Sequence, residues 1–406
     1  MKRVRSFQPG RRTLGISAFC LALATHPCMG QAGPLRADRV STQQERQDEA
    51  QTAFAKGDFR GALQVFRALA REGDGPSQMI LAMMMRLGWE TPQDLVASSA
   101  WGELAQGACG PAQNAAMVTM VKPVAERGEP KAQSMMGMLV ADGSVVDLKP
   151  DASVAWFKAA AAQGEPYALW AYGRALEEGH GVPKNPEEAR RMYGLAWEKG
   201  STFAAHRLGT IFFRGNNVKR DIPEGIRWYK LAAEHGDAIA AYQLGWIYTN
   251  KQGVPKDLAE GFKWNLQSAR RGYPSAQIHV GDAYRDGSGL AKDPVEAFKW
   301  FALATYNGRT LERIEYFNYA LDEFQQAGKR LDRETQSKAL IALAHRCRDG
   351  DGVPQDLVAA MLFLRLPEIQ VTDALEKEKE ALQARLTPYE LTRVSTRLNH
   401  WPSFKR

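Results

Sequence analysis

Five glycines stand 36 residues apart through the middle of the chain, and no other feature constrains its fold as strongly. An alanine, a second glycine and a large apolar residue, usually tryptophan, recur with the same period. The four sets are Gly137, Gly173, Gly209, Gly245 and Gly281; Ala132, Ala168, Ala204, Ala240 and Ala276; Gly164, Gly200, Gly236, Gly272 and Gly308; and Trp156, Met192, Trp228, Trp264 and Trp300. Self-similarity at a period of about 20 to 50 residues is typical of solenoids, which stack one structural unit many times.

Each unit is predicted to be a pair of antiparallel helices. From Ala240 to Tyr248, small and apolar residues lie three and four positions apart, as on one face of a helix. A loop follows, and the second helix is expected to carry its tryptophan inward and to end at the closing glycine, which permits a left-handed cap. The loops end in predicted capping boxes, in which Asn185, Asp221, Asp257 and Asp293 precede Glu188, Glu224, Glu260 and Glu296.

The pattern resembles the Sel-like repeat family, a relative of the tetratricopeptide solenoids. The family motif, A-x3-LG-x-LY-x2-G-x-GV-x2-D-x3-A-x2-W-x2-A-A-x2-G, is matched five times within 130–308. Departures are Met192 in place of tryptophan, Lys149 in place of the capping aspartate, and Asn216 and Asn217 in place of loop glycines. The resemblance implies an all-α, right-handed α/α superhelical solenoid of about 36-residue repeats with a protein-binding role.

The register weakens on both sides of these five units. Degenerate helical repeats are predicted over 49–129: a hairpin at 50–72, a unit at 77–107 and a shortened helix pair at 112–128. Downstream, 309–406 is predicted to hold an inserted helix over 314–324, an interrupted last repeat, and a C-terminal helical cap whose final helix opens with a capping box at Thr387 and Glu390. A polar terminal helix of this kind seals the end of a solenoid.

The N-terminus is predicted to be a secretory signal peptide over 1–32. Five basic residues precede an apolar stretch at 14–24, and a small-residue site predicts cleavage after Ala32. Arg11 and Arg12 leave a twin-arginine signal as an alternative, and Cys20 and Cys28 leave a lipid anchor as another. Residues 33–48 are expected to form a polar tether, and the mature chain is expected to be periplasmic or secreted.

The balance of charge becomes nearly even once this segment is removed. The whole chain has 53 basic and 46 acidic residues, and loss of residues 1–32 leaves 48 basic residues. We expect no Lys/Arg stripe, no nucleic-acid partner and no integral membrane segment after cleavage.

Cys109 and Cys347 remain after cleavage and are more than six repeats apart. Because an extended superhelix would hold them far beyond disulfide distance, we expect buried free thiols, with an intermolecular disulfide as the alternative.

Sequence motifs for catalysis are missing. The seven histidines form no HExxH or HxH motif, and neither CxxC, GxSxG nor a phosphate-binding loop occurs. The recurring acidic residues are explained as helix caps. We therefore expect no enzyme activity, no cofactor and no metal.

A binding surface is the remaining candidate site. In each first helix, the positions two before and two after the leucine, and a further row three residues on, are predicted to face the concave side. The predicted partner-binding residues on that face are Trp170, Arg174, His206, Phe213, Tyr242, Trp246, Asp282 and Arg285. Aromatic and arginine side chains are the usual anchors of interfaces. The alternative is that the rings fill the tight curve between adjacent repeats.

These features favour an exported protein-binding scaffold or adaptor of the cell envelope. A carbohydrate-binding protein or polysaccharide-secretion scaffold is one alternative, because aromatic rings in a groove also suit sugars. A cell-wall or β-lactam hydrolase is another, and it would need a nucleophile and base in the folded groove.

Overall fold

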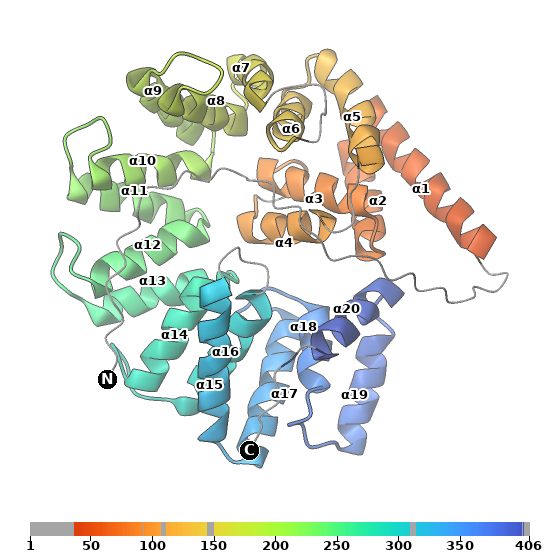
Figure 1. Ribbon diagram of the computed structural model, residues 1–406, viewed down its shortest axis with the longest axis vertical. Coiled ribbons are helices and arrows are strands. Elements are labelled where there is room, and N and C mark those ends of the chain that lie inside the picture. The colour runs from red at the N-terminus through yellow and green to blue at the C-terminus, as the bar shows by residue number, and fades with distance from the viewer. Residues whose placement is uncertain are drawn as a thin grey trace.

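The computed structural model describes residues 36–91, 93–106, 111–143, 150–308, 314–399 and 401. Within these ranges the structure is built from helices and contains no β-strand. The helices follow one another round a superhelical turn (Figure 1). The prediction of an all-α solenoid is therefore confirmed.

Five helix pairs in strict phase form the middle of the superhelix. Each first helix packs most extensively on its own second helix, and each second helix then packs on the first helix of the next pair. The pairs are α6 (Pro130–Ala141) with α7 (Ser153–Ala162), α8 (Pro166–Glu178) with α9 (Pro186–Glu198), α10 (Thr202–Arg214) with α11 (Ile222–Glu234), α12 (Ala238–Thr249) with α13 (Leu258–Arg270), and α14 (Pro274–Asp286) with α15 (Pro294–Gly308). A short 3₁₀ turn, η1 (Pro150–Ala152), precedes α7.

The in-phase glycines allow the two helices of a pair to approach closely. A Cβ atom at Gly173 would lie 2.9 Å from the ring of Tyr193, and one at Gly209 would lie 2.7 Å from the ring of Tyr229. The residues over Gly137, Gly245 and Gly281 are Phe157, Asn265 and Phe301. The period therefore records one repeated contact, in which a side chain of the second helix lies flat on a bare backbone.

The second helix buries the residue after its tryptophan more deeply than the tryptophan itself. Tyr229 is 3% exposed, whereas Trp228 is half-buried and its Nε1 donates to Glu224 of its own helix at 2.7 Å. Trp264 repeats this arrangement with Glu260 at 2.8 Å. The prediction that tryptophan points inward is confirmed for Trp300, which is 2% exposed, whereas Trp228 and Trp264 pack against a core cluster but stay half-buried.

Half of each predicted capping box is present. The side chains of Asn185, Asp221, Asp257 and Asp293 accept from the amides three residues later, as predicted. The glutamate side chains do not accept from the amides of the capping residues, as a complete capping box would require. The amide of each capping residue donates instead to a carbonyl of the preceding helix, as Asp221 does to Phe212 at 2.9 Å. The glutamates are thereby free to pair with basic residues of their own helices.

Five helices precede the in-phase repeats: α1 (Arg36–Lys56), α2 (Phe59–Arg71), α3 (Gly75–Leu87), α4 (Leu95–Gln106) and α5 (Pro111–Glu126). The hairpins predicted at 50–72 and 77–107 are confirmed as α1–α2 and α3–α4. The prediction of a polar tether over 33–48 is wrong from residue 36 onward, because residues 36–48 belong to α1. There Arg46 pairs with Glu72, and Gln47 bonds Asp74 at 2.6 Å.

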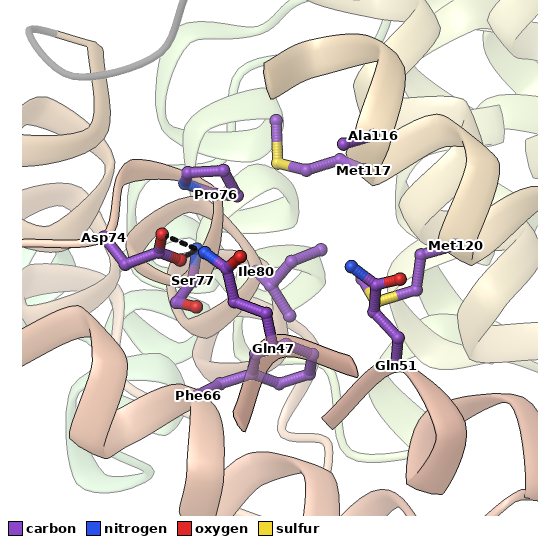
Figure 2. Close-up of a pocket in the computed structure, with 10 residues that line it drawn as sticks. All are labelled: Gln47, Gln51, Phe66, Asp74, Pro76, Ser77, Ile80, Ala116, Met117 and Met120. Carbon is purple, nitrogen blue, oxygen red and sulfur yellow. Dashed lines mark hydrogen bonds between the residues drawn. The ribbon is translucent and has the colours of Figure 1, made fainter. Parts of the chain in front are cut away.

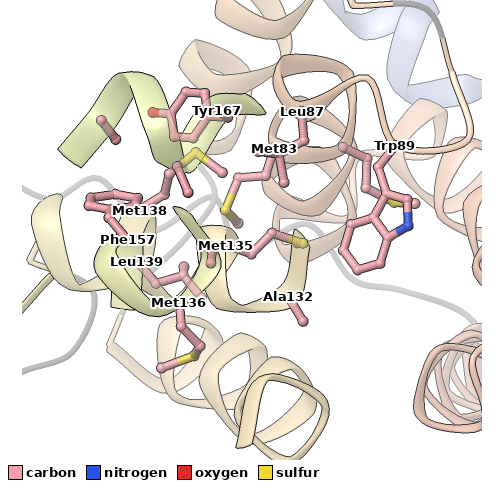
Figure 3. Packing of buried hydrophobic residues seen from close by; sticks show 14 of the residues in the cluster. Met83, Leu87, Trp89, Ala132, Met135, Met136, Met138, Leu139, Phe157 and Tyr167 are labelled. Carbon is pink, nitrogen blue, oxygen red and sulfur yellow. The ribbon is translucent and has the colours of Figure 1, made fainter. Parts of the chain in front are cut away.

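The prediction of a shortened helix pair at 112–128 is also wrong. One helix, α5, spans that segment with Pro123 inside it, and it packs on α6, α1 and α3. Methionine side chains fill the space between α3 and α6, where Met83, Met135 and Met138 share one buried cluster with Phe157 and Tyr167 (Figure 3). Flexible thioethers suit such an irregular joint between a degenerate and a regular unit.

The C-terminal part contains α16 (Ile314–Lys329), α17 (Arg333–Asp349), α18 (Leu357–Leu364), α19 (Asp373–Gln383) and α20 (Pro388–Asn399). The inserted helix is confirmed as α16. The capping box at the start of α20 is complete, because the Thr387 amide donates to Glu390 at 2.9 Å and the Glu390 amide donates to Thr387 at 3.2 Å.

Hairpin α3–α4 lies inside the superhelical turn (Figure 1). Thr202 at the start of α10 donates to Gln93 at 2.9 Å. Val96 of α4 and Pro354 from the loop before α18 both flank Gly272. The predicted signal peptide, with Cys20 and Cys28, lies outside the described residues, as do residues 33–35, Cys109 and Lys149.

Candidate functional site

The predicted partner-binding face lies on the first helices of the repeats, and neighbouring parts of the chain cover most residues of these helices. In α6, α8, α10, α12 and α14, every residue before the final position is buried or half-buried. The second helices carry the exposed residues, such as Glu187 and Arg191 of α9. The first helices are therefore the inner layer of the solenoid, and the second helices are its outer layer.

The first row of predicted residues joins each repeat to the next. Trp170 contacts Phe203 with ring centroids 4.9 Å apart, and Tyr242 contacts Tyr273 at 5.2 Å. At the equivalent position of α6, Ser134 donates to Glu165 at 2.5 Å. The alternative that rings fill the curve between adjacent repeats accounts for these two aromatics.

His206 occupies the same row and pairs with the cap of the next first helix. Its Nδ1 lies 3.1 Å from Oδ2 of Asp237, which is 1% exposed. Burial alone would raise the pKa of Asp237, but His206 and the amides of Ala240 and Ile239 outweigh burial and lower this pKa. His206 thus stabilises the ionised cap that begins α12.

Phe213 and Trp246 pack into the hydrophobic core. Phe213 is 9% exposed, its ring contacts Tyr229, and Arg220 lies over it at 5.7 Å. Trp246 is half-buried against the cluster that contains Leu244. Phe213 is therefore closed to a partner in this conformation, and Trp246 presents only part of its ring.

Arg174 has the most accessible side chain among the predicted charged residues. Its side chain is 41% exposed, compared with 24% for both His206 and Arg285. The guanidinium lies 5.2 Å from the centre of the Trp170 ring and 3.3 Å from Glu178. Trp170 and Arg174 thus form a partly open cation–π pair on α8.

Helix α16 covers Asp282 and Arg285. Tyr319 donates to Asp282 at 2.8 Å, and Arg285 contacts Asp282 at 2.9 Å and Glu323 at 2.6 Å. Burial raises the pKa of Asp282 more than Arg285 and Tyr319 lower it. These two predicted residues fix the inserted helix in place, a role that sequence spacing did not indicate.

The eight predicted residues therefore do not form one continuous open patch. Trp170 with Arg174, and Asp282 with Arg285, form two local groups. His206, Phe213, Tyr242 and Trp246 lie between them in the joints and core of adjacent repeats.

Two in-phase charged rows follow the outer surface. The glutamates at the start of the second helices pair with a basic residue three positions on, as in Glu188–Arg191 and Glu224–Arg227. Lys184, Arg220, Lys256 and Lys292 form an exposed row in the loops. An acidic cap directly follows three of the four members of this row, and the expectation of no Lys/Arg stripe stays a prediction.

A small cavity lies between α1, α3 and α5 (Figure 2). Its volume is about 60 Å³, and its walls include Phe66, Ile80 and Met117. Asp74 at its edge accepts from Gln47 and from the Ser77 amide. The cavity can hold a water or two but is too small for an organic ligand.

No metal-ligating group of three residues and no helix able to span a membrane occurs in the part of the chain that the structure describes. Cys347 is 1% exposed and carries a free thiol, whose pKa is raised by burial and by nearby Asp356.

The geometry defines an α-solenoid of stacked helix pairs. The model of the Sel1 repeat matches 130–165, 166–201, 202–237, 238–273, 274–308 and 337–366, which together span just over half of the chain. The chain belongs to the Sel1 repeat family. Sel1 repeat proteins are protein-binding scaffolds and typically lack enzyme activity.

Several solved structures resemble the chain. A Sel1 repeat protein from Oxalobacter formigenes is 26% identical, with 62% of this chain and 89% of that chain covered and a TM-score of 0.42. The protective antigen c5321 of uropathogenic Escherichia coli is 18% identical, with 89% of this chain and 94% of that chain covered and a TM-score of 0.39. The immunity protein Pa5087 of Pseudomonas aeruginosa is 19% identical, with 47% of this chain and 73% of that chain covered and a TM-score of 0.37. Comparison with curated proteins gives no match.

Proposed function

We propose that this protein is an exported scaffold of the cell envelope that binds a protein partner through the inner layer of its solenoid. The pair formed by Trp170 and Arg174 carries this proposal. It combines an aromatic ring with a guanidinium whose side chain is 41% exposed. Aromatic and arginine side chains dominate the energetics of protein interfaces, because they bury large areas and bond in several directions.

The chemistry of the inner layer favours a protein over a carbohydrate. Sugar recognition by stacking needs an open ring face, but Trp170 and Tyr242 direct their rings at Phe203 and Tyr273. Arg174 instead offers donors suited to a carboxylate or a backbone carbonyl.

Export is proposed from the sequence of residues 1–32, with its basic, apolar and small-residue segments. Mass spectrometry of the protein recovered from the periplasm or medium should find a chain beginning at Gly33. An intact Met1 on protein retained in the cytoplasm would contradict this part of the proposal.

Site-directed photo-crosslinking tests the binding face without removing a packing residue. A photoreactive phenylalanine at position 178, the exposed last residue of α8, leaves Trp170 and Arg174 in place and should cross-link a partner protein in the native host. The same group at position 191 provides the control, because the Arg191 side chain is 62% exposed on the outer layer. Equal cross-linking at both positions, or cross-linking at position 191 alone, would contradict binding at the inner layer.

A further inference from the structure

The two ends of the described superhelix meet. The start of α20 lies against the end of α2, although the contacting residues are more than 300 positions apart (Figure 1). Within the C-terminal part, α20 packs on α18, and Arg397 donates to the carbonyl of Tyr306 at 3.3 Å. Helix α20 therefore belongs to the C-terminal half while it touches the N-terminal half.

Arg71 and Glu390 form the centre of this contact. Nε of Arg71 donates to Oε1 of Glu390 at 2.9 Å, and Nη2 donates to Oε2 at 3.1 Å. The same Nη2 donates to the carbonyl of Arg385 at 3.1 Å, and Thr387 donates to the carbonyl of Arg71 at 2.6 Å. A bidentate pair supported by backbone bonds specifies one geometry, which a single flexible ion pair would not.

Tyr389 adds a steric contact beside the ion pair. A Cβ atom at Gly73 would lie 2.7 Å from the Tyr389 ring, and Gly73 has a φ of +95°. The turn between α2 and α3 thus offers a bare backbone that accepts the ring. The ion pair, the backbone bonds and the ring contact together form a small, specific interface.

Separate hydrophobic cores lie on the two sides of this interface. Phe66 of α2 belongs to a buried cluster that extends no further along the chain than Ile211. Val394 of α20 belongs to another cluster, which begins at Ala269. Because neither cluster crosses the contact, the α2–α20 interface can separate without opening a core.

The inner hairpin belongs with the N-terminal body. Met83 and Leu87 of α3 share the first buried cluster with Tyr167 of α8, and Thr202 of α10 donates to Gln93. Toward the C-terminal body, Val96 of α4 lies beside Gly272. This peripheral apolar contact can separate without opening either cluster.

We propose that the contact between α2 and α20 is a latch, which holds the superhelix closed around hairpin α3–α4 and whose release uncovers the inner layer. The latch follows from the contacts alone, whereas its control of partner binding rests on the proposed function. Relative movement of two bodies that retain their own cores is a common form of conformational switch.

Small-angle X-ray scattering of the full chain tests the latch directly. Arg71→Ala should increase the radius of gyration and the maximum dimension, with unchanged helical circular dichroism. Arg191→Ala is the matched control, because Arg191 also makes a bidentate pair, with Glu188 at 2.6 and 2.8 Å, but within one helix. Its dimensions should equal those of the wild type.

Glu390→Gln provides a second variant that keeps a side-chain acceptor for the cap of α20 while it removes the charge. It should expand the particle as Arg71→Ala does, and hydrogen exchange over 93–106 should rise in both variants. Wild-type dimensions in both variants would overturn the latch.

Partner binding is measured separately, by cross-linking at position 178. The yield should rise when Arg71→Ala is added, and an unchanged yield from an expanded particle would overturn the control of binding. Absence of a cross-link in both backgrounds, with the expansion observed, would count against the proposed function and leave the latch supported.

Discussion

The ring of Tyr229 lies on the backbone of Gly209, and a Cβ atom there would be 2.7 Å from its Cδ1. Equivalent ring contacts recur at Gly173 in the preceding unit and at Gly281 two units further on. One steric requirement, repeated every 36 residues, thus explains the strongest pattern in the sequence. It also shows which glycines are required by packing and which are not.

Gly209→Ala should therefore destabilise the protein, because the added methyl group overpacks the helix pair at a cost of about 1–3 kcal/mol. The gain of about 1 kcal/mol that alanine normally brings to a helix interior offsets part of this cost, so the net destabilisation should lie between about 0 and 2 kcal/mol. Urea denaturation followed by circular dichroism measures the change.

The control for this substitution is Gly194→Ala in α9, where an added Cβ meets nothing within 4 Å. This change should stabilise the protein by up to about 1 kcal/mol. Similar destabilisation by both substitutions would show that steric contact with the ring is not the reason for the period.

The repeat period predicted the fold because it reports local, recurring contacts. The sequence fixes neither which face of a first helix stays open nor what lies opposite it, since both depend on long-range packing. Trp170 is predicted to face a partner, with packing between adjacent repeats as the alternative, and its ring lies against Phe203 of the next repeat. No sequence pattern predicts that Arg71 pairs with Glu390, because this contact depends on the accumulated turn of the whole superhelix.

The hydrogen bond from Tyr193 to Glu177 should contribute more stability than the bond between Tyr229 and Thr210. Tyr193 donates at 2.7 Å to a carboxylate that Arg207 also binds, whereas the Tyr229 and Thr210 hydroxyls lie 3.1 Å apart. Tyr193→Phe should cost about 1.5–3 kcal/mol, and Tyr229→Phe about 0.5–1.5 kcal/mol. Equal costs in chemical denaturation would contradict a charged partner at Tyr193.

Acid stability should depend on His206. The pKa of Asp237 is lowered in the folded protein, so this residue contributes stability above its unfolded pKa of about 3.9. That contribution is lost as the pH falls through the folded pKa. His206→Ala should raise the folded pKa, and acid unfolding should then begin at a higher pH.

An acid titration followed by circular dichroism measures this shift. His180→Ala is the control, because the His180 side chain is 64% exposed and pairs with Glu178 at the end of α8. An acid midpoint that moves equally in both variants would exclude a specific role for the His206–Asp237 pair.

Removal of Arg285 should loosen α16. Asp282 and Glu323 both contact this arginine, so Arg285→Ala would leave two half-buried carboxylates facing each other without a cation. Hydrogen exchange over 314–329 should increase, while exchange in α8 stays unchanged. Adding Asp282→Asn and Glu323→Gln to Arg285→Ala removes the repulsion and should restore much of the protection. If protection stayed lost in the triple variant, packing of the arginine side chain, and not its charge, would hold the inserted helix.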